Sequence, residues 1–209
     1  DISAQKEAEA RVRSTGKELA AKNEQIESEL ALARKLQVAF ATFRFPSELS
    51  LEGNLSVKAS YLYEPSEHLA GDFFQLFQID EHRFAAFICD VMGHGVRSAL
   101  VTAVIRGLIE ENREHICHPD VLFTHINSIL NRLAQDPDFP RFVTGTLALF
   151  DTHENVIQLV NAGHHPVLRY CTNDPEGLSE LPLKRNPALG LLPNFQYTVT
   201  EVPLSTGCS

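Results

Sequence analysis

The chain has 209 residues, of which 44% are hydrophobic and 22% charged, enough for one globular domain with a substantial core and an appendage. The formal net charge is −9 and there is no basic run, which argues against binding to nucleic acid or to an anionic membrane surface, because phosphate affinity needs clustered Lys and Arg. No stretch approaches the roughly 18 apolar residues of a membrane span, so we expect no direct membrane contact.

Residues 1–45 are rich in Ala, Glu, Lys, Gln and Leu and contain no proline, which predicts one long helix. Apolar side chains recur along it every seven residues, at Val12, Leu19, Ile26, Ala33 and Phe40. This repeat is typical of a two-stranded coiled coil, so we interpret the segment as a linker that forms a homodimer; a helix packed on its own domain is the alternative. The chain begins at Asp1 without Met or a signal peptide, so we expect a longer protein with an upstream sensor or receiver domain.

Pro46 and Ser47 close the helical segment, and a globular part is predicted over 46–209. Alternating apolar and polar residues predict a strand around 55–63, and two further runs predict strands over 72–80 and 83–91. Because the turn between these two runs is short, we expect an antiparallel hairpin. Helices are predicted over 95–114 and 119–134. The first has one apolar face, made of Val96, Leu100, Ala103, Val104, Gly107 and Leu108.

Four more strands are predicted over 142–151, 155–163, 166–171 and 196–202. Strands on both sides of a helical pair predict an α+β fold of two antiparallel sheets flanked by helices. The four cysteines are widely scattered, at Cys89, Cys117, Cys171 and Cys208, which fits a reduced, cytoplasmic context better than a disulfide framework.

Two aspartates occupy the open end of the predicted hairpin. Asp72 and Asp90 lie at equal distances from Glu81 in the turn, so they should face each other with their Cβ atoms about 5 Å apart. Opposed like charges destabilise a sheet, and a divalent cation such as Mg²⁺ or Mn²⁺ is the simplest compensation. Gly71, Gly93 and Gly95 would allow close approach to a ligand and a sharp loop into the next helix. A pair of surface aspartates beside a glycine turn remains the alternative.

Several blocks of the sequence resemble a known family. HLAGDFFQLF (68–77) and AAFICDVMGHGVRSALVTA (85–103) are similar to two signature blocks of SpoIIE/RsbU-type phosphatases, the bacterial stress and sporulation branch of the metal-dependent PPM (type 2C) serine/threonine phosphatases. TGTLALFDTHENVIQLVNAGHHPVLRY (144–170) and NPALGLLP (186–193) resemble two further blocks. IESELALARKLQVAF (26–40) resembles the helical linker that often precedes this domain.

The resemblance implies an αββα sandwich with a pair of Mn²⁺ or Mg²⁺ ions between its sheets. Asp72 and Asp90 would be metal ligands, and the Val91 carbonyl a backbone ligand. Gly93 and His94 lie in the metal loop, where His94 would either act as a general acid or shape the loop. Asn161 and His164 belong to a family block and are expected to be structural. A metal-activated water would attack phosphorus in line, with no phospho-enzyme intermediate.

The function implied is hydrolysis of phosphoserine or phosphothreonine on a small STAS-type anti-anti-sigma partner. The family pattern continues beyond Ser209 with further acidic ligands, so we expect this chain to lack part of the metal site and to be inactive or weak in metal binding on its own. A pseudophosphatase of the same fold, acting as a binding or adaptor module, is the alternative. A dimerising sensor domain without metal is a third reading.

Overall fold

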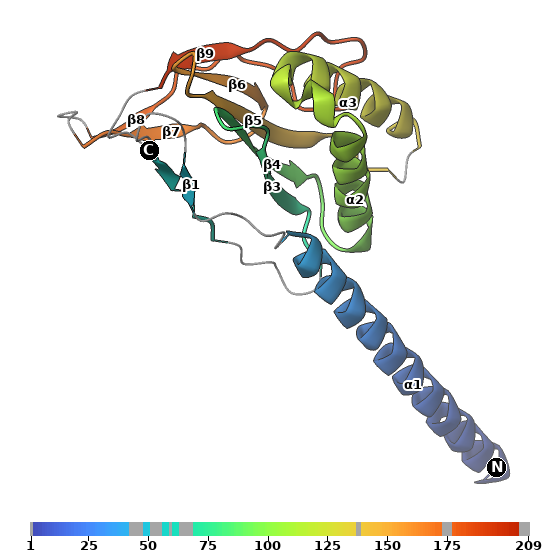
Figure 1. Cartoon of the computed structure of the whole chain (residues 1–209). Coiled ribbons are helices and arrows are strands. Elements are labelled where there is room, and N and C mark those ends of the chain that lie inside the picture. The colour runs from blue at the N-terminus through green and yellow to red at the C-terminus, as the bar shows by residue number, and fades with distance from the viewer. Residues whose placement is uncertain are drawn as a thin grey trace.

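A computed structural model describes residues 2–41, 48–50, 56–58, 60–62, 69–136, 139–172 and 177–204 (Figure 1). The α+β class is as predicted: a five-stranded antiparallel sheet carries helices on one face, and one long helix precedes it. The predicted boundary at Pro46 and Ser47 lies outside the described residues.

The N-terminal helix α1 (Ile2–Ala41) projects away from the sheet along most of its length (Figure 1). Val12, Leu19 and Ile26 of the seven-residue repeat are 73%, 59% and 53% exposed. This part of the apolar stripe is therefore not packed on the chain's own domain. Near the sheet, Ala33 and Gln37 become half-buried, so packing on the domain accounts for the last turns alone. Pairing of α1 with a second helix stays a prediction.

The central sheet has the order β3-β4-β5-β6-β9, and each neighbouring pair is antiparallel. Its strands are β3 (Asp72–Gln78), β4 (Arg83–Val91), β5 (Val143–Asp151), β6 (Val156–Ala162) and β9 (Thr200–Pro203). The predicted hairpin is confirmed as β3–β4, with Gln78 opposite Phe84 beside the turn. Asp80 closes this turn: its carboxylate accepts hydrogen bonds from the backbone N–H groups of His82 and Arg83 and from the Arg83 guanidinium.

The structure also contains two small two-stranded sheets whose pairing was not predicted from the sequence. They pair β1 (Glu48–Ser50) with β2 (Ser56–Lys58) and β7 (Leu168–Tyr170) with β8 (Leu178–Glu180). The strand predicted over 55–63 is described at 56–58 alone, and Tyr61 and Leu62 lie outside any strand. The strand predicted over 196–202 is shorter and shifted, at Thr200–Pro203. Strands of three or four residues are too short for alternation to locate their ends.

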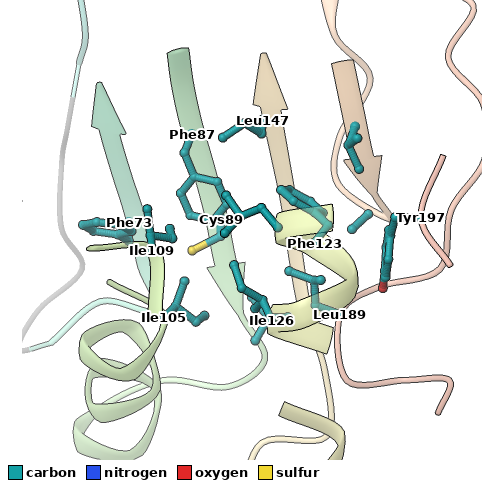
Figure 2. Close-up of a cluster of buried hydrophobic side chains, with 14 of the residues drawn as sticks. Phe73, Phe87, Cys89, Ile105, Ile109, Phe123, Ile126, Leu147, Leu189 and Tyr197 are labelled. Carbon is teal, nitrogen blue, oxygen red and sulfur yellow. The ribbon is translucent and has the colours of Figure 1, made fainter. Parts of the chain in front are cut away.

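Helices α2 (Val96–Glu111) and α3 (Pro119–Leu133), joined by the 3₁₀ helix η2 (Arg113–Cys117), pack on one face of the central sheet (Figure 1). Figure 2 shows the core between them, where Phe73, Phe87 and Leu147 of the sheet meet side chains of both helices. The labelled members from the helices are Ile105, Ile109, Phe123 and Ile126. This core fixes the ends of β3 and β4 relative to the start of α2.

The predicted apolar face of α2 is not its buried face. The helix buries Val101, Ile105 and Ile109, whereas Leu100 is 63% exposed and Val96 is 49% exposed. Both faces of α2 are rich in apolar residues, so periodicity alone could not choose between them. The exposed face turns toward the end of α1, where Leu36 and Leu100 line a common cavity.

The cysteines partly contradict the expectation of unbridged thiols. Cys89 and Cys117 are free, but Cys171 is disulfide-bonded. Among the described residues, no helix is both long enough and apolar enough to cross a membrane.

Candidate metal centre

The structure brings Asp72 and Asp90 together at the open end of the β3–β4 hairpin. Asp72 is the first residue of β3 and pairs directly with Asp90, one residue before the end of β4. Their neighbours Phe73, Cys89 and Val91 point into the helix-covered core, so alternation turns both carboxylates to the opposite face. Both side chains stay accessible to solvent. The predicted register is therefore confirmed, whereas the role of the pair stays a prediction.

The surroundings of Asp90 disfavour the charged form of its carboxyl group. Partial burial disfavours the charged form of Asp90, and the Asp72 carboxylate repels it, so the pKa of Asp90 is raised above its ordinary value. The electrostatic effects of His164 and His165 act in the opposite direction and are smaller than either of these causes. A site that raises the pKa of a carboxylate and leaves it accessible is suited to a positive ligand.

At this end of the sheet, the backbone at Gly71 lies close to Val91 and Asp90 of β4. A Cβ atom added there would lie 2.7 Å from the Val91 carbonyl oxygen and 3.4 Å from Asp90 Oδ1. The Val91 N–H donates to the Gly71 carbonyl at 3.3 Å. Glycine is therefore required at 71, and through it the Val91 carbonyl and the Asp90 carboxylate lie beside the same backbone segment.

The loop that leaves β4 turns sharply through two glycines. Gly93 and Gly95 have φ values of 94° and 85°, which side-chain-bearing residues rarely adopt. Gly95 precedes the first turn of α2, as predicted, and its N–H donates to the Leu69 carbonyl at 3.4 Å. His94, between the glycines, is exposed. Its role in proton transfer or in shaping the loop remains a prediction.

A second loop reaches the aspartates from the end of β6. Asn161 Oδ1 accepts a hydrogen bond from the His164 N–H, and Asn161 Nδ2 donates to the His165 carbonyl. This structural role of Asn161 agrees with the expectation. His164 Nδ1 lies 2.9 Å from Thr144 Oγ1, and the Thr144 hydroxyl donates to the Asp90 carbonyl at 3.4 Å.

The position of His164 goes beyond what the sequence reasoning expected. Together with Asp72 and Asp90 it lines a cavity of about 700 Å³ on the face of the sheet away from α2 and α3. Burial, and then His165, lower the pKa of His164, while the two aspartates oppose this effect. The neutral imidazole is thus favoured beside the carboxylates. In the sequence, His164 stood out as part of the family block Asn-Ala-Gly-His. That block alone did not predict where the side chain lies relative to the aspartates.

The residues present fit a hydrated hard cation. Two facing carboxylates and a nearby carbonyl oxygen match Mg²⁺ or Mn²⁺, since Mg²⁺ is commonly held by one or two carboxylates and completes its shell with water. Within the described ranges, no group of three His, Cys, Asp or Glu side chains is arranged to hold a metal ion. The oxygen donors at this site, two carboxylates and a carbonyl, suit a hard cation better than a thiolate zinc site.

Comparisons with known proteins agree with the sequence motifs. Residues 80–209 match the family model of stage II sporulation protein E (SpoIIE). Asp90, Val91, Gly93 and His94 lie inside the matched range, and Asp72 lies before it. The phosphoserine phosphatase RsbP of Bacillus subtilis (strain 168) is 31% identical over 170 residues, which cover 81% of this chain. The match covers 40% of the length of RsbP.

Solved structures share the fold. The SiaA-PP2C domain of Pseudomonas aeruginosa superposes with a TM-score of 0.66 at 19% identity, over 90% of this chain and 71% of that domain. RsbX, solved in complex with magnesium, gives a TM-score of 0.52 at 16% identity, over 77% of this chain and 67% of RsbX. Since the SpoIIE match spans more than half of the sequence, the chain belongs to the SpoIIE family, the SpoIIE/RsbU type of PPM (type 2C) protein phosphatases.

Proposed function

We propose that this chain is the metal-dependent serine/threonine phosphatase domain of a bacterial signalling protein. The observation that carries the proposal is the direct pairing of Asp72 with Asp90 at the end of the hairpin. Family membership supplies the reaction class, and the phosphatase name of RsbP supports it. We assign residues 46–209 to the phosphatase domain and residues 1–45 to a linker and dimerisation segment.

In this proposal Asp72, Asp90 and the Val91 carbonyl hold divalent ions, Mn²⁺ or Mg²⁺, with two ions in the complete site. Bound ions of this kind lower the pKa of a water and neutralise charge on phosphoryl oxygens. α2 begins at Val96, a short loop after β4, and the free backbone N–H groups of its first turn would favour an anion near its start. His94 either protonates the leaving oxygen or shapes the loop.

The proposed substrate is a phosphoserine or phosphothreonine on a STAS-type protein. The cavity beside the aspartates is about 700 Å³ and is lined mostly by apolar side chains, together with His164 and His165. Such a space accommodates a phosphorylated side chain together with part of its carrier segment. We further propose a cytoplasmic location, a homodimer formed through α1 and control by an upstream sensor or receiver domain.

The decisive experiment measures Mn²⁺-dependent hydrolysis of p-nitrophenyl phosphate and of a phosphoserine STAS protein by the full-length protein. Asp72→Asn and Asp90→Asn should abolish turnover. Glu81→Gln, a carboxylate-to-amide change at the other end of the same hairpin, should leave turnover unchanged because Glu81 is exposed and remote from the pair. Equal rates in all four proteins would rule out the metal mechanism. Binding of the STAS protein without turnover would instead identify a pseudophosphatase.

A further inference from the structure

A glutamine of the linker helix is hydrogen-bonded through both ends of its amide to the backbone just before Asp72. Gln37 Nε2 donates to the Ala70 carbonyl oxygen at 2.7 Å, and the Ala70 N–H donates to Gln37 Oε1 at 3.1 Å. Ala70 is 4% exposed, so this contact is shielded from water on the backbone side. One side chain of α1 thus replaces the strand partner that Ala70 would otherwise need.

The three residues before Asp72 are each held by a different element. The Leu69 carbonyl accepts from the Gly95 N–H, in the loop that follows β4. The Gly71 carbonyl accepts from the Val91 N–H and, at 3.2 Å, from the buried Thr102 hydroxyl of α2. Ala70 is the member of this segment that α1 holds. The path of the backbone into Asp72 therefore depends on the placement of α1.

Beside this hydrogen-bonded pair, apolar side chains of α1 and α2 line a common cavity. Ala33 and Leu36 of α1 line this cavity of about 440 Å³ together with Val96, Leu100 and Ala103 of α2. Apolar contacts are not directional, so they tolerate sliding or rotation of one helix on the other. The paired hydrogen bonds of Gln37 are directional and fix one position of α1.

We propose that Gln37 is a positioning residue for Asp72, and that it makes the geometry of the metal ligands depend on how the linker helix is docked. When the amide pair is made, Ala70 is fixed and Asp72 faces Asp90. When α1 moves and the pair breaks, Ala70 loses its partner and the start of β3 loosens. This inference rests on the proposed metal centre, because it assigns Asp72 to metal binding.

The test uses amide hydrogen exchange and Mn²⁺ titration on the full-length protein and its variants. Gln37→Met keeps the length and packing of the side chain but removes both hydrogen bonds. We expect exchange at residues 69–72 of the metal-free protein to accelerate about tenfold, and Mn²⁺ affinity to fall by a similar factor. Gln25→Met is the matched control, since Gln25 lies on the same helix and bonds Glu29 on the exposed surface.

Each outcome separates the inference from the proposed function. Unchanged exchange at residues 69–72 in Gln37→Met would overturn the inference, since packing alone would then hold the segment. Faster exchange with unaltered Mn²⁺ affinity would overturn the link to Asp72. A wild-type protein that binds no Mn²⁺ would refute the proposed function, while the exchange rates would still decide whether Gln37 holds the start of β3.

Discussion

The two ends of the β3–β4 hairpin shift the pKa values of their carboxyl groups in opposite directions. At the closed end, Asp80 accepts hydrogen bonds from Arg83 and from two backbone N–H groups, and these interactions lower its pKa. At the open end, Asp72 and Asp90 face each other, and burial and mutual repulsion raise the pKa of Asp90. The closed end stabilises the charged form of its carboxylate and the open end disfavours it, so the local environment, and not residue type, separates the two ends.

The largest expected effect tests whether the open-end pair acts as one unit. Asp72→Asn or Asp90→Asn alone should lower Mn²⁺-dependent kcat/KM by at least about a hundredfold, because each change removes a charged ligand. The double variant should lose little more than either single variant, since groups that share one function are not additive. Steady-state kinetics with a phosphoserine substrate measures this. If the fold loss in kcat/KM of the double variant equals the product of the two single losses, the two aspartates do not act as one unit.

The next effect concerns the close approach at Gly71. In Gly71→Ala the new methyl group would meet the backbone oxygen of Val91, which cannot move aside as a flexible side chain can. We expect the free energy of unfolding to fall by about 2 kcal/mol, measured by urea denaturation. Gly107→Ala in α2 is the matched control. Nothing lies within 4 Å of its added Cβ, so we expect a gain of about 0.5–1 kcal/mol. A Gly71→Ala protein at least as stable as the wild type would show that the contact with the Val91 oxygen does not constrain this position.

A smaller effect tests the stabilising role of the closed end. Asp80→Ala should lower the free energy of unfolding by about 1 kcal/mol at pH 7, with the ion pair discounted for its solvent exposure. Because hydrogen bonding to Arg83 lowers the pKa of Asp80 in the folded state, this contribution is present above about pH 4 and is lost as the pH falls through the folded-state pKa. Chemical denaturation of both proteins from pH 7 to pH 3 should show the difference shrinking. A constant difference would exclude the titration.

The smallest effect has the opposite sign at the open end. The raised pKa of Asp90 means that its ionisation costs stability in the metal-free protein as the pH rises through that value. Asp90→Asn should therefore raise the free energy of unfolding by up to about 1 kcal/mol at pH 7 in a chelating buffer, and the gain should vanish below about pH 4. When Mn²⁺ is added, the wild type should become more stable to unfolding than Asp90→Asn. A destabilised metal-free variant would show that Asp90 makes favourable contacts of its own.

Sequence reasoning succeeded where one pattern dictated one geometry. Strand alternation and a short turn fixed the register of Asp72 and Asp90, because a strand has a period of two. It failed for α2, where Leu100 and Ile105 lie on faces of similar hydrophobicity and the core selected the second. It also missed the contact of Gln37 with Ala70. A hydrogen bond between a side chain and a distant backbone group produces no repeating pattern in the amino-acid sequence. For His164, the family block was recognised, but the turn held by Asn161 gives the residue its place.

The β3–β4 turn has a consequence for how such a domain can change over evolution. Strand registry follows the number of residues between Gln78 and Phe84, and inserting a single residue there would turn one aspartate to the opposite face of the sheet. The connection can therefore vary in composition far more freely than in length. The length of this turn sets which residues face each other at the open end. We expect an insertion there to abolish the proposed activity although Asp72 and Asp90 are both retained in the sequence.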